Sequence, residues 1–163
     1  MDSKLSTSLV VGAVFVFVGY ASRPAYGAPP SDPCSLLTQS QASAVLGAQV
    51  AEGRRVATKL CEWASLGAPG LNAKKVTITF ETAQSFANSK APVGHGITKA
   101  PVSGIGDEAI YGTTPHFATT LTFKKGDFFF TVHVWGFPLD QAKAIDEVQA
   151  KERTLALQIL AKL

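Results

Sequence analysis

Apolar and polar residues alternate most clearly from Lys74 to Glu81, where Val76, Ile78 and Phe80 fall on one side of the chain and polar residues fall on the other. This two-residue period predicts a β-strand with one buried face. Shorter stretches with the same character, separated by glycine-containing or polar turns, predict the remaining strands. They cover residues 56–64, 98–102, 108–111, 119–123 and 128–135.

The last two of these strands predict a hairpin that turns on Lys125 and Gly126, because glycine supplies the positive φ that tight hairpin turns need. With this turn, Phe123 is expected to pair with Phe128, and one face of the hairpin is then largely apolar. The segment from Gly104 to Asp107 is expected to be a turn between strands, since a strand and not a helix follows its glycines.

Three segments carry helix signals. Thr38 followed by Gln41 is a capping-box pattern, and the helix it starts ends before Gly47. Thr82 can cap a short helix over residues 83–89, and residues 140–162 are expected to form a long helix without glycine or proline. A stripe of apolar residues along the long helix contains Glu152, so this carboxylate is either paired beneath the helix or, as we expect, solvated where the helix extends past the sheet.

Together these elements predict an α+β fold: a two-layer sandwich with a mostly antiparallel sheet of five to six strands and helices on one face, including the long C-terminal helix. Residues 28–163 are expected to form one domain. The first 27 residues have the three zones of a signal peptide: Lys4, an apolar run over residues 9–21, and small residues around Gly27. We therefore expect cleavage after about Gly27 during export, and a periplasmic or secreted product without a lipidation cysteine.

Two cysteines, Cys34 and Cys61, follow the predicted signal peptide. In an oxidising compartment such a pair is most simply a disulfide, although a catalytic thiol with a bystander remains an alternative. The whole chain has 15 basic and 12 acidic residues, and loss of Lys4, Arg23 and Asp2 with the signal peptide leaves 13 and 11. This near balance argues against a nucleic-acid partner.

The polar face of the sheet holds the candidate site. Alternation places Phe129, Thr131, His133 and Trp135 together on it, and large aromatic side chains on a solvated face often mark a binding surface. These four residues are therefore a possible ligand surface, unless a loop such as residues 88–96 folds over them. The histidines lack metal-ligand spacing, no nucleophile motif is present, and we expect neither a metal nor a cofactor.

Four segments of the chain also resemble an uncharacterised bacterial family of exported proteins and lipoproteins. They are Asp32-Pro33-Cys34 at the start, Cys61-Glu62-Trp63 in a strand, the Gly104-Ile105-Gly106-Asp107-Glu108-Ala109 turn, and the closing helix that ends at Leu163. The resemblance implies a disulfide between Cys34 and Cys61 and a compact α/β domain at the cell envelope. It implies no reaction and no catalytic residue.

The leading functional hypothesis is an exported, non-catalytic binding or accessory domain, whose partner is an envelope component or a small ligand. The oligomeric state is not predicted. One alternative is a small hydrolase that uses His133 with a carboxylate such as Glu81, which requires the two side chains to share a proton. Another is an inhibitor or partner-stabilising protein that inserts the loop at residues 88–96.

Overall fold

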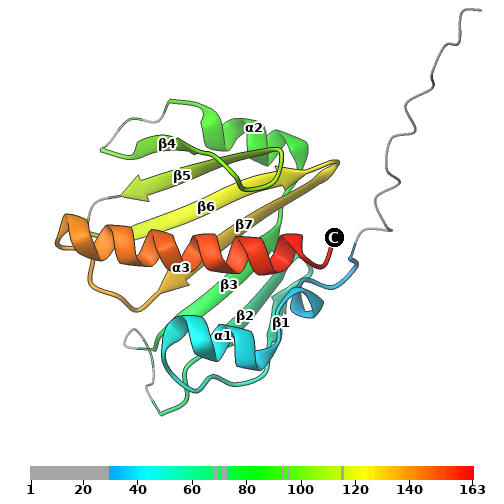
Figure 1. Cartoon of the computed structure of the whole chain (residues 1–163), viewed down its shortest axis with the longest axis vertical. Helices are drawn as coiled ribbons and strands as arrows, with labels where there is room; N and C mark the ends of the chain where they lie inside the picture. The colour runs from blue at the N-terminus through cyan, green and yellow to red at the C-terminus, as the bar shows by residue number, and fades with distance from the viewer. Residues whose placement is uncertain (1–29, 68–69, 71–72, 93, 95, 115) are drawn as a thin grey trace, which may run out of the picture.

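The computed structural model describes residues 30–67, 70, 73–92, 94, 96–114 and 116–163, so the predicted signal peptide lies outside the described residues. Within these residues, seven strands form one antiparallel sheet in the order β1-β2-β3-β7-β6-β5-β4 (Figure 1). The strands are β1 (Arg54–Ala57), β2 (Leu60–Ala64), β3 (Lys75–Phe80), β4 (Thr98–Val102), β5 (Glu108–Thr114), β6 (Ala118–Lys125) and β7 (Phe128–Trp135). The helices are η1 (Pro33–Leu36), α1 (Gln39–Leu46), α2 (Ala83–Lys90) and α3 (Ala142–Leu160).

The predicted α+β class with a C-terminal helix is confirmed, but the sheet has seven strands in the described residues, where five to six were expected. The stretch 56–64, predicted as one strand, folds as the end of β1 and as β2, with a tight turn at Thr58 and Lys59. Neither turn residue is glycine or proline, so the local sequence carries no strong signal for this reversal.

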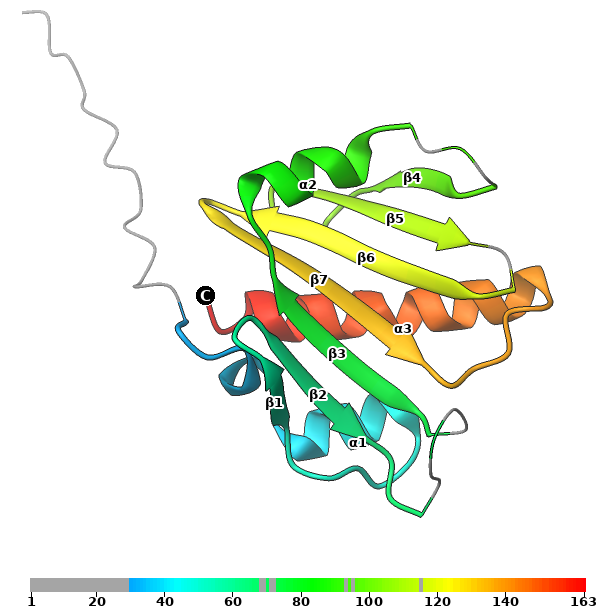
Figure 2. The same ribbon diagram turned by 180° about the vertical axis from the view of Figure 1, so that it is seen from behind.

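The helices cover both faces of the sheet, which corrects the prediction that they lie on one face. Figures 1 and 2 show α1 and α3 together on one side. On the other side, Phe86 of α2 packs against Phe129, with ring centroids 5.5 Å apart. Phe129 and the buried Ile110 make this end of the second face apolar, so covering Phe129 with Phe86 is favourable.

The start of the domain folds as its sequence predicts. The Thr38 side chain accepts a hydrogen bond from the Gln41 amide in a complete capping box, and Gly47 ends α1 with a φ of 63°. The predicted disulfide joins Cys34 in η1 to Cys61 in β2, which ties the N-terminal segment to the core. Among the described helices, none has the length and apolar character needed to cross a bilayer.

The β6–β7 hairpin turns one residue later than predicted, on Gly126 and Asp127. Phe123 therefore pairs with Phe130, not with Phe128. The two-residue change in register leaves the same side chains on the core face, because side chains alternate with a period of two. The turn is held by Asp107, whose Oδ2 accepts a 2.6 Å hydrogen bond from the Gly126 amide.

The expected turn at residues 104–107 is present and packs directly on this hairpin. Gly106 has a φ of 56°, and a Cβ at this position would collide with the backbone carbonyl oxygen of Lys124. The Asp107 amide donates to that same carbonyl oxygen at 2.9 Å. Glycine is therefore required at position 106 both for its backbone conformation and for the close approach of two chain segments.

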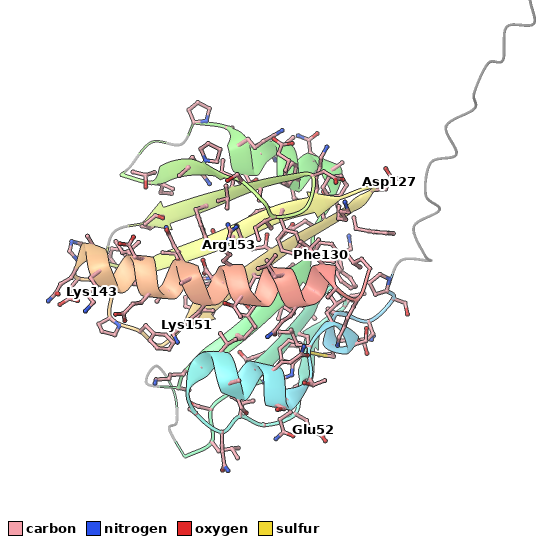
Figure 3. All side chains as sticks on the ribbon, viewed as in Figure 1. Glu52, Asp127, Phe130, Lys143, Lys151 and Arg153 are labelled. Atoms are coloured by element: carbon pink, nitrogen blue, oxygen red, sulfur yellow. A yellow bond between two sulfur atoms is a disulfide. The ribbon has the colours of Figure 1, made fainter. Side chains whose placement is uncertain are left out.

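Glu152 is fully buried beneath α3, which overturns our expectation that it is solvated. Its neighbours extend to either flank of the helix (Figure 3): Lys151 donates to the Val45 carbonyl of α1 at 2.8 Å, and Arg153 donates to the Ser103 carbonyl at 3.1 Å. Successive helical residues are about 100° apart, so the side chain between these two points at the sheet. Glu152 lies in the middle of α3, where the helix packs on β6 and β7, and this is why the carboxyl group is buried.

Candidate binding groove

The four predicted surface residues lie on one face of β7, but they have different surroundings. Phe129 is half-buried beneath Phe86 of α2, and Thr131 is half-buried with its hydroxyl 3.1 Å from that of Thr122. A helix, and not the loop at residues 88–96, thus covers one end of this face. Helix α2 extends to Lys90, so the segment after it is shorter than predicted, and positions 93 and 95 of that segment lie outside the described residues.

His133 and Trp135 form a stacked pair at the other end of the strand. Their ring centroids are 3.6 Å apart with an interplanar angle of 27°, and Trp135 is 44% exposed while His133 is only 9% exposed. Burial lowers the pKa of His133 to about 4, so the imidazole is uncharged at neutral pH. The ring therefore supports one face of the indole and leaves its other face available.

The sheet register separates His133 from Glu81. His133 lies opposite Thr77 in the β3–β7 ladder, whereas the Glu81 amide bonds the carbonyl of Phe129. Four residues along a strand span roughly 13 Å, far beyond the roughly 3 Å at which two groups share a proton. The His133–Glu81 pair that the hydrolase hypothesis named does not form in this structure.

On the second face of the sheet, α2 lies over the β5–β6 side and leaves the β1–β2–β3 side uncovered (Figure 2). A groove of about 430 Å³ lies on this uncovered side. Its walls contain two exposed apolar side chains, Trp135 and Val56, which are 44% and 43% exposed. The volume is within the range of small-molecule sites, which are typically apolar with a few polar groups. The groove is lined by Val56, Leu60, Glu62, Gly70, Ala73, Lys75, Thr77, Trp135 and Gly136.

The groove is assembled from four strands that meet in register. Lys75 pairs with Trp135, and Thr77 pairs with both His133 and Glu62, so their side chains project from the same face. An irregularity in the β1–β2 ladder between Arg55 and Ala57 accompanies the placement of Val56 at the edge of the groove.

Gly136 closes one end of the groove. It has a φ of 82°, and a Cβ there would lie 2.7 Å from the carbonyl oxygen of Ala73. Only glycine tolerates both conditions without strain, since the obstacle is backbone. The chain can thus leave β7 directly beside the segment that enters β3, and Trp135 is held at this junction.

Glu62 and Lys75 form the charged part of the groove lining, and Arg54 contacts Glu62 from β1. Glu62 accepts from Arg54 through Oε1 at 3.3 Å and faces Lys75 through Oε2 at 3.4 Å. Both carboxylate oxygens are engaged, and two cations surround one anion.

The sequence pointed to Trp135 but not to the rest of the groove. Alternation placed Lys75 and Thr77 on the same face as Trp135, whereas Val56 and Leu60 become neighbours only because the chain reverses between β1 and β2. Predicting a turn at residues 58–59 would have placed Val56 and Leu60 on neighbouring strands. Those two residues, however, carry little turn signal.

Other features give weaker candidates. A hollow of about 500 Å³ lies between α1 and α3, but its Lys151 ammonium is already bonded to the Val45 carbonyl. In the part of the chain that the structure describes, no three His, Cys, Asp or Glu side chains gather as metal ligands would. Comparison of the chain with family models, with curated proteins and with solved structures finds no match.

Proposed function

We propose that this chain is an exported, non-catalytic binding domain that holds a small, flat ligand against Trp135 in the groove. The observation that carries the proposal is the half-exposed indole, whose inner face is supported by His133 while its outer face borders an apolar groove. An aromatic ring that is already fixed in place loses little conformational freedom when it binds a second flat group.

Export is supported by the Cys34–Cys61 disulfide, because such bonds persist in oxidising compartments. The apolar N-terminal run and the small residues before Ala28 support it independently. The domain would then act in the periplasm or outside the cell, where its partner is an envelope component or a small ligand.

A binding role is favoured over a hydrolase for a geometric reason. His133 is buried under an indole, and the register holds it far from Glu81, so the pair lacks the contact that general base catalysis needs. Trp135, in contrast, is positioned by strand pairing and by the Gly136 junction, and nearly half of its surface is open to a ligand.

The proposal is tested by screening a small-molecule library with ¹⁵N–¹H spectra of protein produced in an oxidising periplasm. The chain has two tryptophans, and Trp63 is buried, so the Trp135 indole N–H is assigned from Trp135→Phe. Ligands of the groove should shift the Trp135 signal and lose affinity about tenfold in Trp135→Leu, given the size of aromatic stacking and burial.

Leu157→Ala is the matched control, because Leu157 has similar exposure, 47%, but lies on the outer side of α3. This variant should bind the same compounds with unchanged affinity. If no compound that binds the protein depends on Trp135, or if binding is lost equally in Leu157→Ala, the groove is not the binding site.

A further inference from the structure

The groove has an unequal charge distribution beside its aromatic platform. Lys75 belongs to the lining, and Arg54 approaches the same carboxylate, Glu62, from the β1 side. The Glu62 side chain is 18% exposed, whereas those of Lys75 and Arg54 are 34% and 74% exposed. The accessible charge at and beside the groove is therefore cationic, and the one carboxylate in the lining has both oxygens in ion pairs.

The two cations flank the same carboxylate. Each lies within 3.4 Å of a Glu62 oxygen, so a ligand carboxylate that binds beside Glu62 is placed next to positive charge. An ammonium has three donors and a guanidinium has five, so neither is saturated by one contact. Two cations and Glu62 carry a net charge of about +1, and a bound ligand carboxylate would bring this group of charges to neutrality.

The remainder of the groove lacks charge and favours an apolar ring. Val56, Leu60 and Ala73 contribute aliphatic surface beside the indole, and Thr77 contributes one hydroxyl. The histidine beneath the indole is uncharged and adds no second positive centre. A sugar would need several hydrogen-bonding partners around its ring. These walls carry more apolar side chains than hydrogen-bonding groups, so they suit a sugar less well.

We infer that the groove selects a flat, apolar molecule that carries one carboxylate, with its ring on Trp135 and its carboxylate at Lys75 and Arg54. This inference rests on the proposed binding function and adds the chemical class of the ligand. The charge pattern disfavours cationic ligands of the same shape. Such a ligand would be repelled by Lys75 and Arg54, and the groove has no carboxylate outside an ion pair to attract it.

Three probes with one ring system test the inference: 2-naphthoate, the neutral 2-naphthamide and the cationic 2-naphthylmethylammonium. Affinities are measured from the Trp135 indole N–H shift at pH 7 and low salt. The expected order is naphthoate, then naphthamide, then the cation, with naphthoate at least about fivefold tighter than naphthamide, as for a partly exposed ion pair. Salt should reduce only the naphthoate advantage.

Lys75→Gln should weaken naphthoate binding more than naphthamide binding, and so remove most of the difference in affinity between the two probes. Lys99→Gln is the matched control, since Lys99 extends from β4 on the same face but at the far edge of the sheet. Retention of the naphthoate preference in this control, together with its loss in Lys75→Gln, would support the inference.

The remaining outcomes overturn it in distinguishable ways. Equal binding of the three probes at Trp135 refutes the charge selection but leaves the groove as a binding site. A Trp135 shift caused by methyl β-glucoside and by none of the naphthyl probes replaces the ligand class with a carbohydrate. Absence of any Trp135 shift with every probe refutes the inference, and the library screen then decides whether the binding function also fails.

Discussion

Replacement of Glu152 by glutamine should stabilise the protein above pH 7 and remove most of its pH dependence there. The Glu152 carboxyl is fully buried between α3 and the sheet, where Oε1 accepts a 3.3 Å hydrogen bond from the Val134 amide. Oε2 lacks a well-formed hydrogen bond within the described residues. Burial raises the pKa of Glu152 to about 8, and the Thr119 hydroxyl and the Val134 amide offset this only in part.

The size of the effect follows from linkage between protonation and folding. In the unfolded chain the carboxyl ionises near its ordinary pKa of 4.5, so between pH 4.5 and about 8 the folded state binds more protons than the unfolded state. The free energy of unfolding therefore falls as pH rises through this range, by about 4–5 kcal/mol in all and about 2 kcal/mol between pH 6.5 and 8. Glutamine keeps the acceptor for Val134 and cannot ionise.

Urea titrations followed by tryptophan fluorescence from pH 4.5 to 8.5 measure this difference. Glu152→Gln should be more stable than the wild type by about 4 kcal/mol at pH 8 and should lose the slope above pH 6.5. Glu147→Gln, on the exposed side of the same helix, is the control and should follow the wild type at every pH. Parallel pH profiles for Glu152→Gln and the wild type above pH 6.5 would refute the burial argument.

His133 should produce the opposite slope at lower pH. Burial lowers its folded pKa to about 4 from an ordinary value of 6.5, so the stability that it contributes is complete above pH 6.5 and is lost as pH falls toward 4. This loss amounts to about 3 kcal/mol. Between pH 4.5 and 6.5 the His133 and Glu152 slopes oppose each other, so wild-type stability in urea titrations should be nearly constant there, and His133→Gln should expose the Glu152 slope.

Three further variants test how the fold is held together. Replacing both Cys34 and Cys61 with serine should lower stability by about 3 kcal/mol in urea titrations, through the greater freedom of the unfolded chain, whereas unchanged stability would show that the bridge does not constrain it. Gly106→Ala should cost at least about 2 kcal/mol, because its Cβ collides with the backbone of β6, and an unchanged midpoint would contradict that contact. Phe86→Ala should cost about 3 kcal/mol and speed amide exchange in α2 more than in α3; equal rates in both helices would contradict its role as the anchor of α2.

Local sequence patterns were sufficient wherever the decisive interactions are short in range. The capping box of Thr38 and Gln41 and the αL glycine at position 47 define α1 through contacts within a few residues. The alternation around Ile78 determines which side chains of β3 face the core, since the two-residue period is a property of every strand. The cysteine pair is likewise readable from the sequence, because only two cysteines are present.

Errors arose where a residue's environment depends on distant elements. The hairpin register was shifted because Asp107, from another turn, bonds the Gly126 amide and selects the turn position. Alternation correctly grouped Phe129 with Trp135, but it could not show that α2 would cover the first and leave the second exposed.

The sequence by itself therefore determined the α+β class, the disulfide and the face on which Trp135 lies, since composition and local periodicity encode these directly. Only the tertiary structure decided that Glu152 is buried and that Val56 and Leu60 line the same groove as Trp135. The physical reason is that burial and neighbourhood depend on which elements pack together, and residues far apart in the chain make that choice.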